Sequence, residues 1–182
     1  ISGMKVGYIE DMYGGIGTEI AYKDVTKPWF LAANFYWVKQ RDFNQRFTFR
    51  DYETFTGHID FFWDTPIEGL SVNISGGRYL ARDSGITLNI SKRFKTGFLL
   101  GAFATRTDIS FGEFGEGIFD KGIYFSIPLD IISSRHNPNN AKFSWKNLTK
   151  DGGQKLMNTL QIQKFLNDSA YNSDYKSYGL QR

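Results

Sequence analysis

The chain has 182 residues, a formal net charge of +3 and no cysteine, and 17% of its residues are aromatic. The lack of cysteine excludes disulfides, thiolate metal sites and a cysteine nucleophile. Lysine and arginine are interspersed with acidic residues, which argues against a nucleic-acid binder. With two histidines, we expect neither a transition-metal site nor a cofactor. The aromatic residues and 19 glycines favour β-structure with many turns.

Most of the chain alternates between apolar and polar residues with period two, which predicts about eight β-strands. In chain order these segments are 4–10, 16–22, 29–38, 53–63, 70–75, 86–91, 98–104 and 123–129. In the fourth segment, Phe55 and Ile59 lie on an apolar face, and His58 and Asp60 lie on the opposite, polar face. Such alternation marks a sheet with one apolar and one polar face.

Alternation alone fits two architectures. In a soluble sandwich the apolar face turns inward, whereas in an outer-membrane barrel it meets lipid and the polar face lines the lumen. Longer predicted connections (41–51, 108–119) alternate with shorter ones (24–28, 64–69, 95–97). Short periplasmic turns opposite longer outside loops are typical of barrels.

Aromatic residues at the ends of the predicted strands also suit the interface girdles of a membrane barrel. They are Trp29, Trp37, Tyr52, Trp63 and Tyr79. The two patterns together predict an all-β, antiparallel, up-and-down transmembrane β-barrel. Its strands either close by themselves or form part of a larger or double barrel.

The alternation stops after Asp130. Residues 131–141 have the composition of a linker, and the rest of the chain is rich in Asn, Ser, Tyr and Lys. Leu156, Leu160 and Phe165 give this region a mild helical spacing. We therefore divide the chain into a barrel, residues 1–130, and a C-terminal periplasmic linker and tail, residues 131–182.

The last predicted strand carries a pattern of polar residue, glycine, aromatic residue and apolar residue in fixed spacing. The residues are Lys121, Gly122, Phe125 and Ile127. The pattern resembles the signal by which the barrel-assembly machinery recognises the last strand of a barrel. This resemblance implies that the barrel ends with this strand.

Longer stretches resemble the YjbH-like (GfcD-like) family of outer-membrane proteins encoded with exopolysaccharide and group 4 capsule genes. They are WVKQRDF at 37–43, FTFRDY at 47–52, GRYLA at 77–81, GAFAT at 101–105, FGEGIFDKGIYFSIP at 114–128 and WKNLTKDGGQ at 145–154. The resemblance implies a longer parent protein with a signal peptide and more strands upstream. It also implies a role in secretion or surface assembly of polysaccharide.

One predicted loop and its surroundings combine arginine with aromatic residues, as a glycan-binding surface does. The candidate glycan-binding residues are Arg41, Phe43, Arg46, Phe47, Arg50, Arg78 and Arg82. Aromatic rings stack on sugar faces, and guanidinium groups pair with uronate or phosphate groups. The alternative is a self-paired loop, or a solvated rim, in which arginine and aspartate hold each other.

We expect the chain not to be an enzyme. An outer-membrane hydrolase could use His58 on the polar face, but no nucleophile stands at a fixed spacing from it. A hydrogen-bonded lumen residue is the simpler interpretation. Glu113 and Glu116 flank glycine on a loop with nothing to hold their separation, which argues against a glycosidase.

The sequence therefore predicts a non-catalytic outer-membrane component for export or surface assembly of exopolysaccharide or capsule. The expected partners are outer-membrane lipid, the polysaccharide, the barrel-assembly machinery, and periplasmic or lipoprotein export partners. Two alternatives stay open: a structural or assembly-factor barrel without glycan contact, and a hydrolase that uses His58.

Overall fold

The computed structural model describes residues 1–44, 46–108, 120–131, 139–146 and 152–156, together with Ile162 and Leu166. Over these residues nine strands form one antiparallel sheet, in which each strand pairs with its neighbours in the sequence. The strands are β1 (Ser2–Glu10), β2 (Tyr13–Lys23), β3 (Trp29–Arg41), β4 (Phe49–Asp64), β5 (Leu70–Arg78), β6 (Ser84–Arg93), β7 (Leu99–Thr107), β8 (Asp120–Pro128) and β9 (Asn140–Lys146), with a 3-10 helix η1 (Leu129–Ile131) after β8. The predicted antiparallel, up-and-down, all-β fold is confirmed.

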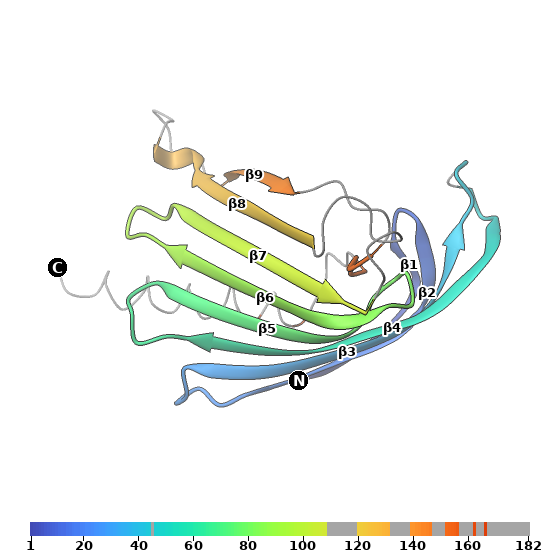
Figure 1. Cartoon of the computed structure of the whole chain (residues 1–182), viewed down its shortest axis with the longest axis horizontal. Coiled ribbons are helices and arrows are strands. Elements are labelled where there is room, and N and C mark those ends of the chain that lie inside the picture. Colours follow the sequence, from blue (N-terminus) through green and yellow to red (C-terminus); the bar gives the residue numbers. More distant parts are fainter. Residues whose placement is uncertain are drawn as a thin grey trace.

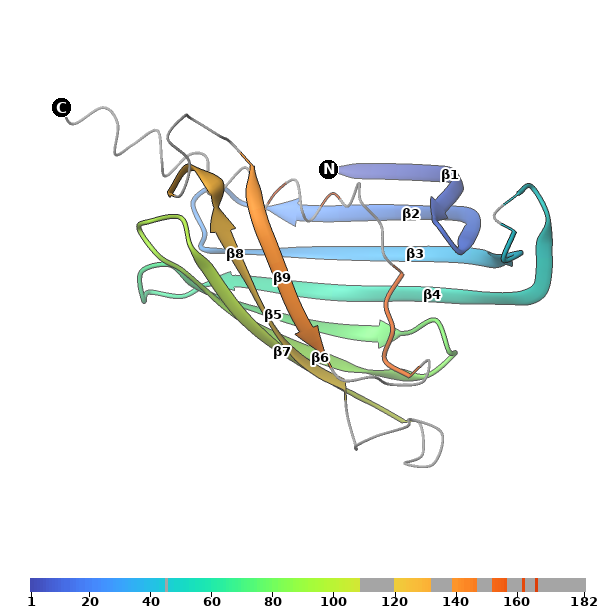
Figure 2. The same ribbon diagram turned by 90° about the horizontal axis from the view of Figure 1, so that it is seen from above.

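The sheet is strongly curved, so that it has a concave and a convex face (Figures 1 and 2). Among the described residues β1 and β9 do not pair with each other, so the sheet is open at both edges. In the part of the chain that the structure describes, no helix has the length and apolarity needed to span a membrane.

The polarity of the two faces is the reverse of that in a water-soluble β-sandwich. Large apolar side chains on the convex face are exposed, among them Val6 (75%), Ile59 (59%) and Ile86 (60%). The alternate residues, which point to the concave face, are mostly polar and buried; Asp60 is 2% exposed and Ser75 is 0% exposed. The predicted alternation is therefore present, with its apolar side turned outward.

The connections alternate between two ends of the sheet, here called the loop end and the turn end. The hairpins β1–β2, β3–β4 and β5–β6 turn at the loop end, and the hairpins β2–β3, β4–β5 and β6–β7 turn at the turn end, where η1 also follows β8. The predicted loop 41–51 is shorter in the structure, because β3 runs to Arg41 and β4 begins at Phe49. This hairpin projects at the loop end (Figure 2). The predicted loop 108–119 lies outside the described residues after Asp108.

Aromatic rings that are exposed or half-buried gather on the convex face at the turn end. Tyr22, Trp29 and Phe61 follow one another at centroid distances of 6.3 and 6.2 Å. A second row crosses the sheet from Phe98 through Phe125 to Phe143 at 6.3 and 4.9 Å. Two of the five aromatic residues predicted for this role point elsewhere: Tyr79 is completely buried, and the hydroxyl of Tyr52 donates to the carbonyl of Leu80 at 2.5 Å.

The sheet does not end at β8, which differs from the predicted boundary at residue 130. Strand β9 continues the sheet, and Trp145 lies opposite Ile123 and Phe143 opposite Phe125. The apolar residues of β9 alternate with Lys142, Ser144 and Lys146, so β9 has the same two-faced pattern as its neighbours. The sequence Lys121 to Ile127 therefore lies in an inner strand of the sheet.

Several glycines lie directly opposite an aromatic residue on the neighbouring strand. The pairs are Gly17 with Tyr36, Gly57 with Phe35, Gly101 with Tyr124 and Gly122 with Phe103. A Cβ atom at Gly17 would stand 1.9 Å from the Tyr36 ring, and one at Gly101 would stand 2.2 Å from the Tyr124 ring. Each ring therefore occupies the space that the missing side chain leaves, which helps to fix the register.

We expect Gly17→Ala to lower the free energy of unfolding by about 1–3 kcal/mol, because the added methyl group overpacks the buried ring of Tyr36. Gly76→Ala is the matched control, since its Cβ would meet no atom closer than 3.9 Å. Urea unfolding of both full-length variants, followed by tryptophan fluorescence, measures the difference. Equal stability of the two variants would mean that Tyr36 can move aside.

Candidate functional site: the concave face and the loop end

The concave face is lined by polar side chains that the curvature of the sheet buries. The buried ones in the strands are Glu19, Thr54, Thr56, His58, Asp60, Ser75, Thr87, Thr105, Asp120 and Ser126. Buried polar groups require hydrogen-bond partners. A chain of hydroxyls runs from Tyr79 to Thr87 at 2.6 Å and from Thr87 to Thr105 at 2.8 Å. The face is thus a partly connected polar surface rather than an apolar core.

His58 lies on this face and is only 4% exposed. Its ring meets that of Tyr79 edge to face, at a centroid distance of 4.7 Å. Its Nε2 atom has no hydrogen-bond partner among the described residues, so this nitrogen does not make the hydrogen bond expected of a lumen residue. The cover that Tyr79 gives it does not favour a role for His58 in hydrolysis of a polymer.

The C-terminal segment, residues 152–156 with Ile162 and Leu166, lies against the concave face. Its backbone is held at several points. The amide of Gly153 donates to Asp83 Oδ2 at 2.8 Å, and the amide of Leu80 donates to the carbonyl of Gln154 at 3.0 Å. Farther along, the amide of Ile162 donates to Glu19 Oε2 at 2.8 Å. These contacts reach the face from the loop after β5 to β2.

Lys155 carries the positive charge of this segment onto the polar face. Its Nζ lies 3.5 Å from Asp60 Oδ1 and donates to the hydroxyl of Ser75. Burial lowers the pKa of the Lys155 ammonium, and the carboxylate of Asp60 opposes this shift. Asn34 Nδ2 donates to the other carboxylate oxygen of Asp60 at 3.4 Å.

Apolar contacts also anchor the C-terminal segment. Leu156 packs in one cluster with Tyr36, Val38 and Leu80. Leu166 packs in a second cluster, with Ala21, Phe30 and Ala32. The concave face therefore has two apolar patches under the segment, one around Leu156 and one around Leu166, between the polar contacts described above, and both partners bury surface there.

From the sequence, residues 131–182 are expected to form a C-terminal periplasmic linker and tail. In the structure, β9 belongs to the sheet and the C-terminal segment packs on its concave face. Leu160 and Phe165, on which the helical spacing depends, lie outside the described residues. The sequence holds one sign of this docking: Ala21, Phe30 and Ala32 lie on an otherwise polar face. An apolar patch on that face requires a covering partner.

The predicted glycan-binding residues of the β3–β4 loop lie together at the loop end. Arg41 stacks over the ring of Tyr8 at 4.0 Å and donates to the carbonyl of Asp11 at 2.8 Å. Arg50 stacks over Phe43 at 4.3 Å, and Phe47 is 86% exposed. Both arginines thus stack on aromatic rings, and Arg41 also donates to backbone carbonyls, whereas the self-paired alternative expects pairs with aspartates. Arg46 is exposed beside them.

The other two candidates, Arg78 and Arg82, also lie near the loop end, and both are exposed. Arg82 has a positive φ of 69°, stacks over Tyr52 at 5.1 Å and donates to the carbonyl of Glu53 at 2.8 Å. Tyr8 and Tyr52 were not predicted as part of this surface. Both are brought to the arginines by neighbouring hairpins, so no local spacing in the sequence marks them.

Comparison with known proteins agrees with the predicted resemblance. The family model YjbH, described as "Exopolysaccharide biosynthesis protein YbjH", matches residues 2–167. The protein named "Uncharacterized lipoprotein YjbH" of Escherichia coli (strain K12) is 41% identical over 171 residues, which cover 91% of this chain and 24% of that relative. The chain thus spans about a quarter of the relative's length. No solved structure matches it. The chain belongs to the YjbH family of exopolysaccharide biosynthesis proteins.

Proposed function

We propose that this chain is the C-terminal part of an outer-membrane β-barrel that acts, without catalysis, in export or surface assembly of exopolysaccharide or capsule. The observation that carries the proposal is the reversed polarity of the sheet. A convex face with exposed Val6, Ile59 and Ile86 suits contact with lipid tails, and a buried polar concave face suits a lumen.

The aromatic rows at the turn end support the same orientation. Membrane barrels carry aromatic girdles where the strands leave the hydrocarbon region. Trp29 and Phe61 occupy this position in one row, and Phe125 and Phe143 occupy it in the other. In this proposal the turn end faces the periplasm and the loop end faces outward. The relative's name, a lipoprotein, fits attachment to a membrane.

Two observations support a barrel that other strands complete: the sheet has open edges, and the chain matches only 24% of its longer relative. Among the described strands β1 and β9 do not pair with each other, and an unpaired edge is unfavourable in lipid. In this proposal the remaining strands come from the longer protein, as a larger or double barrel. The proposed partners are outer-membrane lipid, the barrel-assembly machinery, the polysaccharide, and periplasmic or lipoprotein export partners.

The test uses the full-length protein in its native envelope. Outer membranes are isolated, gel mobility is compared with and without boiling, and surface polysaccharide is measured in a strain that lacks the protein. A mobility shift on boiling together with a loss of surface polymer supports the proposal. A water-soluble protein without a shift contradicts the membrane barrel, and unchanged surface polymer contradicts the export role.

We expect the triple variant Arg46→Gln, Arg50→Gln and Arg82→Gln to reduce surface polysaccharide without changing the amount of folded protein. These guanidinium groups are exposed and would pair with acidic groups of the polymer. Lys95→Gln is the control, since Lys95 is 84% exposed at the turn end. Unchanged export in the triple variant favours the alternative, a structural or assembly-factor barrel without glycan contact.

A further inference from the structure

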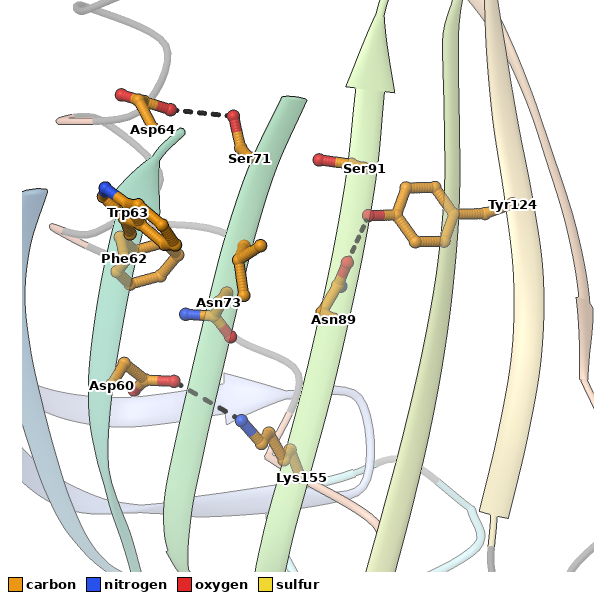
Figure 3. A pocket seen from close by; sticks show the side chains of 11 residues that line it. Asp60, Phe62, Trp63, Asp64, Ser71, Asn73, Asn89, Ser91, Tyr124 and Lys155 are labelled. Carbon is orange, nitrogen blue, oxygen red and sulfur yellow. Dashed lines mark hydrogen bonds and ion pairs between the residues drawn. The ribbon is translucent and has the colours of Figure 1, made fainter. Parts of the chain in front are cut away.

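A pocket of about 260 Å³ lies on the concave face, toward the turn end. Strands β4, β5, β6 and β8 form its wall, and Lys155 of the C-terminal segment closes one side (Figure 3). This volume is slightly below the range of roughly 300–1,000 Å³ usual for small-molecule sites. The pocket therefore suits one small polar unit rather than a folded partner.

The lining of the pocket is rich in groups that both donate and accept hydrogen bonds. Ser71 donates to Asp64 Oδ1 at 2.7 Å, and Tyr124 donates to Asn89 Oδ1 at 2.8 Å. These bonds orient the side chains and leave further donor and acceptor positions open, because a carboxylate and an amide each have more than one. A sugar hydroxyl is itself both donor and acceptor and would match such a surface.

Asn73 gives the most direct sign that this surface can bind a ligand. Its side chain lies in the middle of the pocket wall, between β4 and β6 (Figure 3). Its Nδ2 atom is buried and has no hydrogen-bond partner among the described residues. A buried donor without a partner is unfavourable, and a bound hydroxyl oxygen would satisfy it.

Phe62 adds an aromatic ring to the polar lining of the pocket. This ring is fixed by stacking on Phe30 at a centroid distance of 4.3 Å. A fixed ring beside polar groups suits a ligand with one apolar and one polar side. A pyranose ring has this character, since its C–H groups and its hydroxyls point in different directions.

The charges of the pocket select against an acidic ligand. Asp60, Asp64 and Lys155 all line it. Lys155 is paired with Asp60 at 3.5 Å, whereas Asp64 accepts a hydrogen bond from the uncharged Ser71. One negative charge therefore remains, and it would repel a carboxylate or a phosphate. The loop end, in contrast, presents arginine.

We propose that this pocket binds a single uncharged, hydroxyl-rich sugar unit, with Asn73, Asn89 and Tyr124 as hydrogen-bonding residues and Phe62 as the stacking ring. The inference rests on the proposed function in one respect: that polysaccharide reaches the concave face. The inference adds that the pocket recognises uncharged units of the polymer. Acidic groups of the polymer would be bound separately, at the loop end.

The test measures binding of small glycosides to the full-length protein in a detergent without a sugar headgroup. Methyl β-D-glucopyranoside and methyl β-D-galactopyranoside are the uncharged probes, and methyl β-D-glucuronide is the anionic probe of the same shape. Saturation-transfer NMR and titration calorimetry follow binding. At least one uncharged probe should bind. The glucuronide should bind at least roughly tenfold more weakly than that probe.

Variants locate the site. Asn73→Ala and Tyr124→Phe should each weaken binding of the uncharged probe by roughly three- to tenfold, which is the effect of one lost hydrogen bond. Asn140→Ala, at an exposed position of β9 that does not line the pocket, is the matched control. Asp64→Asn keeps the acceptor for Ser71 but removes the charge, so it should strengthen glucuronide binding.

The outcomes separate this inference from the proposed function. Three results would each show that the pocket assignment is wrong, provided that the protein still shifts on boiling. They are no binding of either uncharged probe, tighter binding of the glucuronide, and unchanged binding in both Asn73→Ala and Tyr124→Phe. The export role is then tested only by the amount of surface polysaccharide in the strain that lacks the protein. If that polymer is unchanged, the export role fails whatever the pocket binds.

Discussion

Replacing Ile59 by arginine is expected to lower the free energy of unfolding of the full-length protein in a phospholipid bilayer by about 2–4 kcal/mol. Ile59 lies within the outward-facing residues of β4 and is 59% exposed. In water, a substitution at so exposed a position changes stability by about 0.5 kcal/mol or less. In lipid, the guanidinium group has to be desolvated or has to distort the bilayer, so the effect is several times larger.

The matched control is Ile67→Arg in the β4–β5 turn. Ile67 is 60% exposed, almost the same as Ile59, but it lies at the turn end, beyond the strands. We expect a change within about 0.5 kcal/mol. Both variants are compared by urea titration of protein folded into vesicles, with folded and unfolded bands separated by gel mobility. Equal small effects at both positions would contradict contact between the convex face and lipid.

The second large effect is expected for Leu156→Ala, which should weaken docking of the C-terminal segment by about 2–4 kcal/mol. Leu156 is 6% exposed and packs against Tyr36, Val38 and Leu80. Its truncation would leave a cavity between the segment and the sheet. Amide hydrogen exchange in peptides that contain Leu80 and Gly153 reports docking, because both amides donate across this contact. A loss of 2 kcal/mol corresponds to roughly 30-fold faster exchange.

Gln154→Ala is the control within the same segment. Gln154 is exposed and accepts from Leu80 through its backbone carbonyl, which the substitution keeps. We expect exchange at Leu80 and Gly153 to be unchanged in this variant. If Leu156→Ala also leaves exchange unchanged, the polar contacts of Gly153 and Lys155 hold the segment without the apolar cluster.

The strands and their faces could be predicted because a period of two is a local property of the sequence. Each of the eight predicted segments overlaps one of the strands β1 to β8, with bounds that differ by a few residues, and the faces of Ile59 and Asp60 are as predicted. Strand β9 was missed because Asn137, Pro138 and Asn139 precede it and Asn140 begins it, and such residues indicate a turn or linker. Its own alternation, through Phe143 and Trp145, is short.

The candidate site was less predictable because its contacts join distant parts of the chain. The sequence marks the arginines of the loop end but not the ring of Tyr8, on which Arg41 stacks. Tyr79 stands just after β5, where the alternation no longer decides its direction, and it turns inward instead of joining a girdle. The pocket depends on Asn73, Asn89 and Tyr124 from three strands, and no single stretch of sequence contains more than one of them.

The docking of the C-terminal segment has a consequence for the order of folding. The contact between Ile162 and Glu19 spans 143 residues, and that between Lys155 and Asp60 spans 95. Contacts between residues so far apart form slowly, because closing a long loop loses chain entropy. The surfaces that receive the segment also do not exist until β2 to β6 have paired. The segment therefore enters last, into a sheet that is already curved, and it can leave again without breaking one hydrogen bond of the strand ladder.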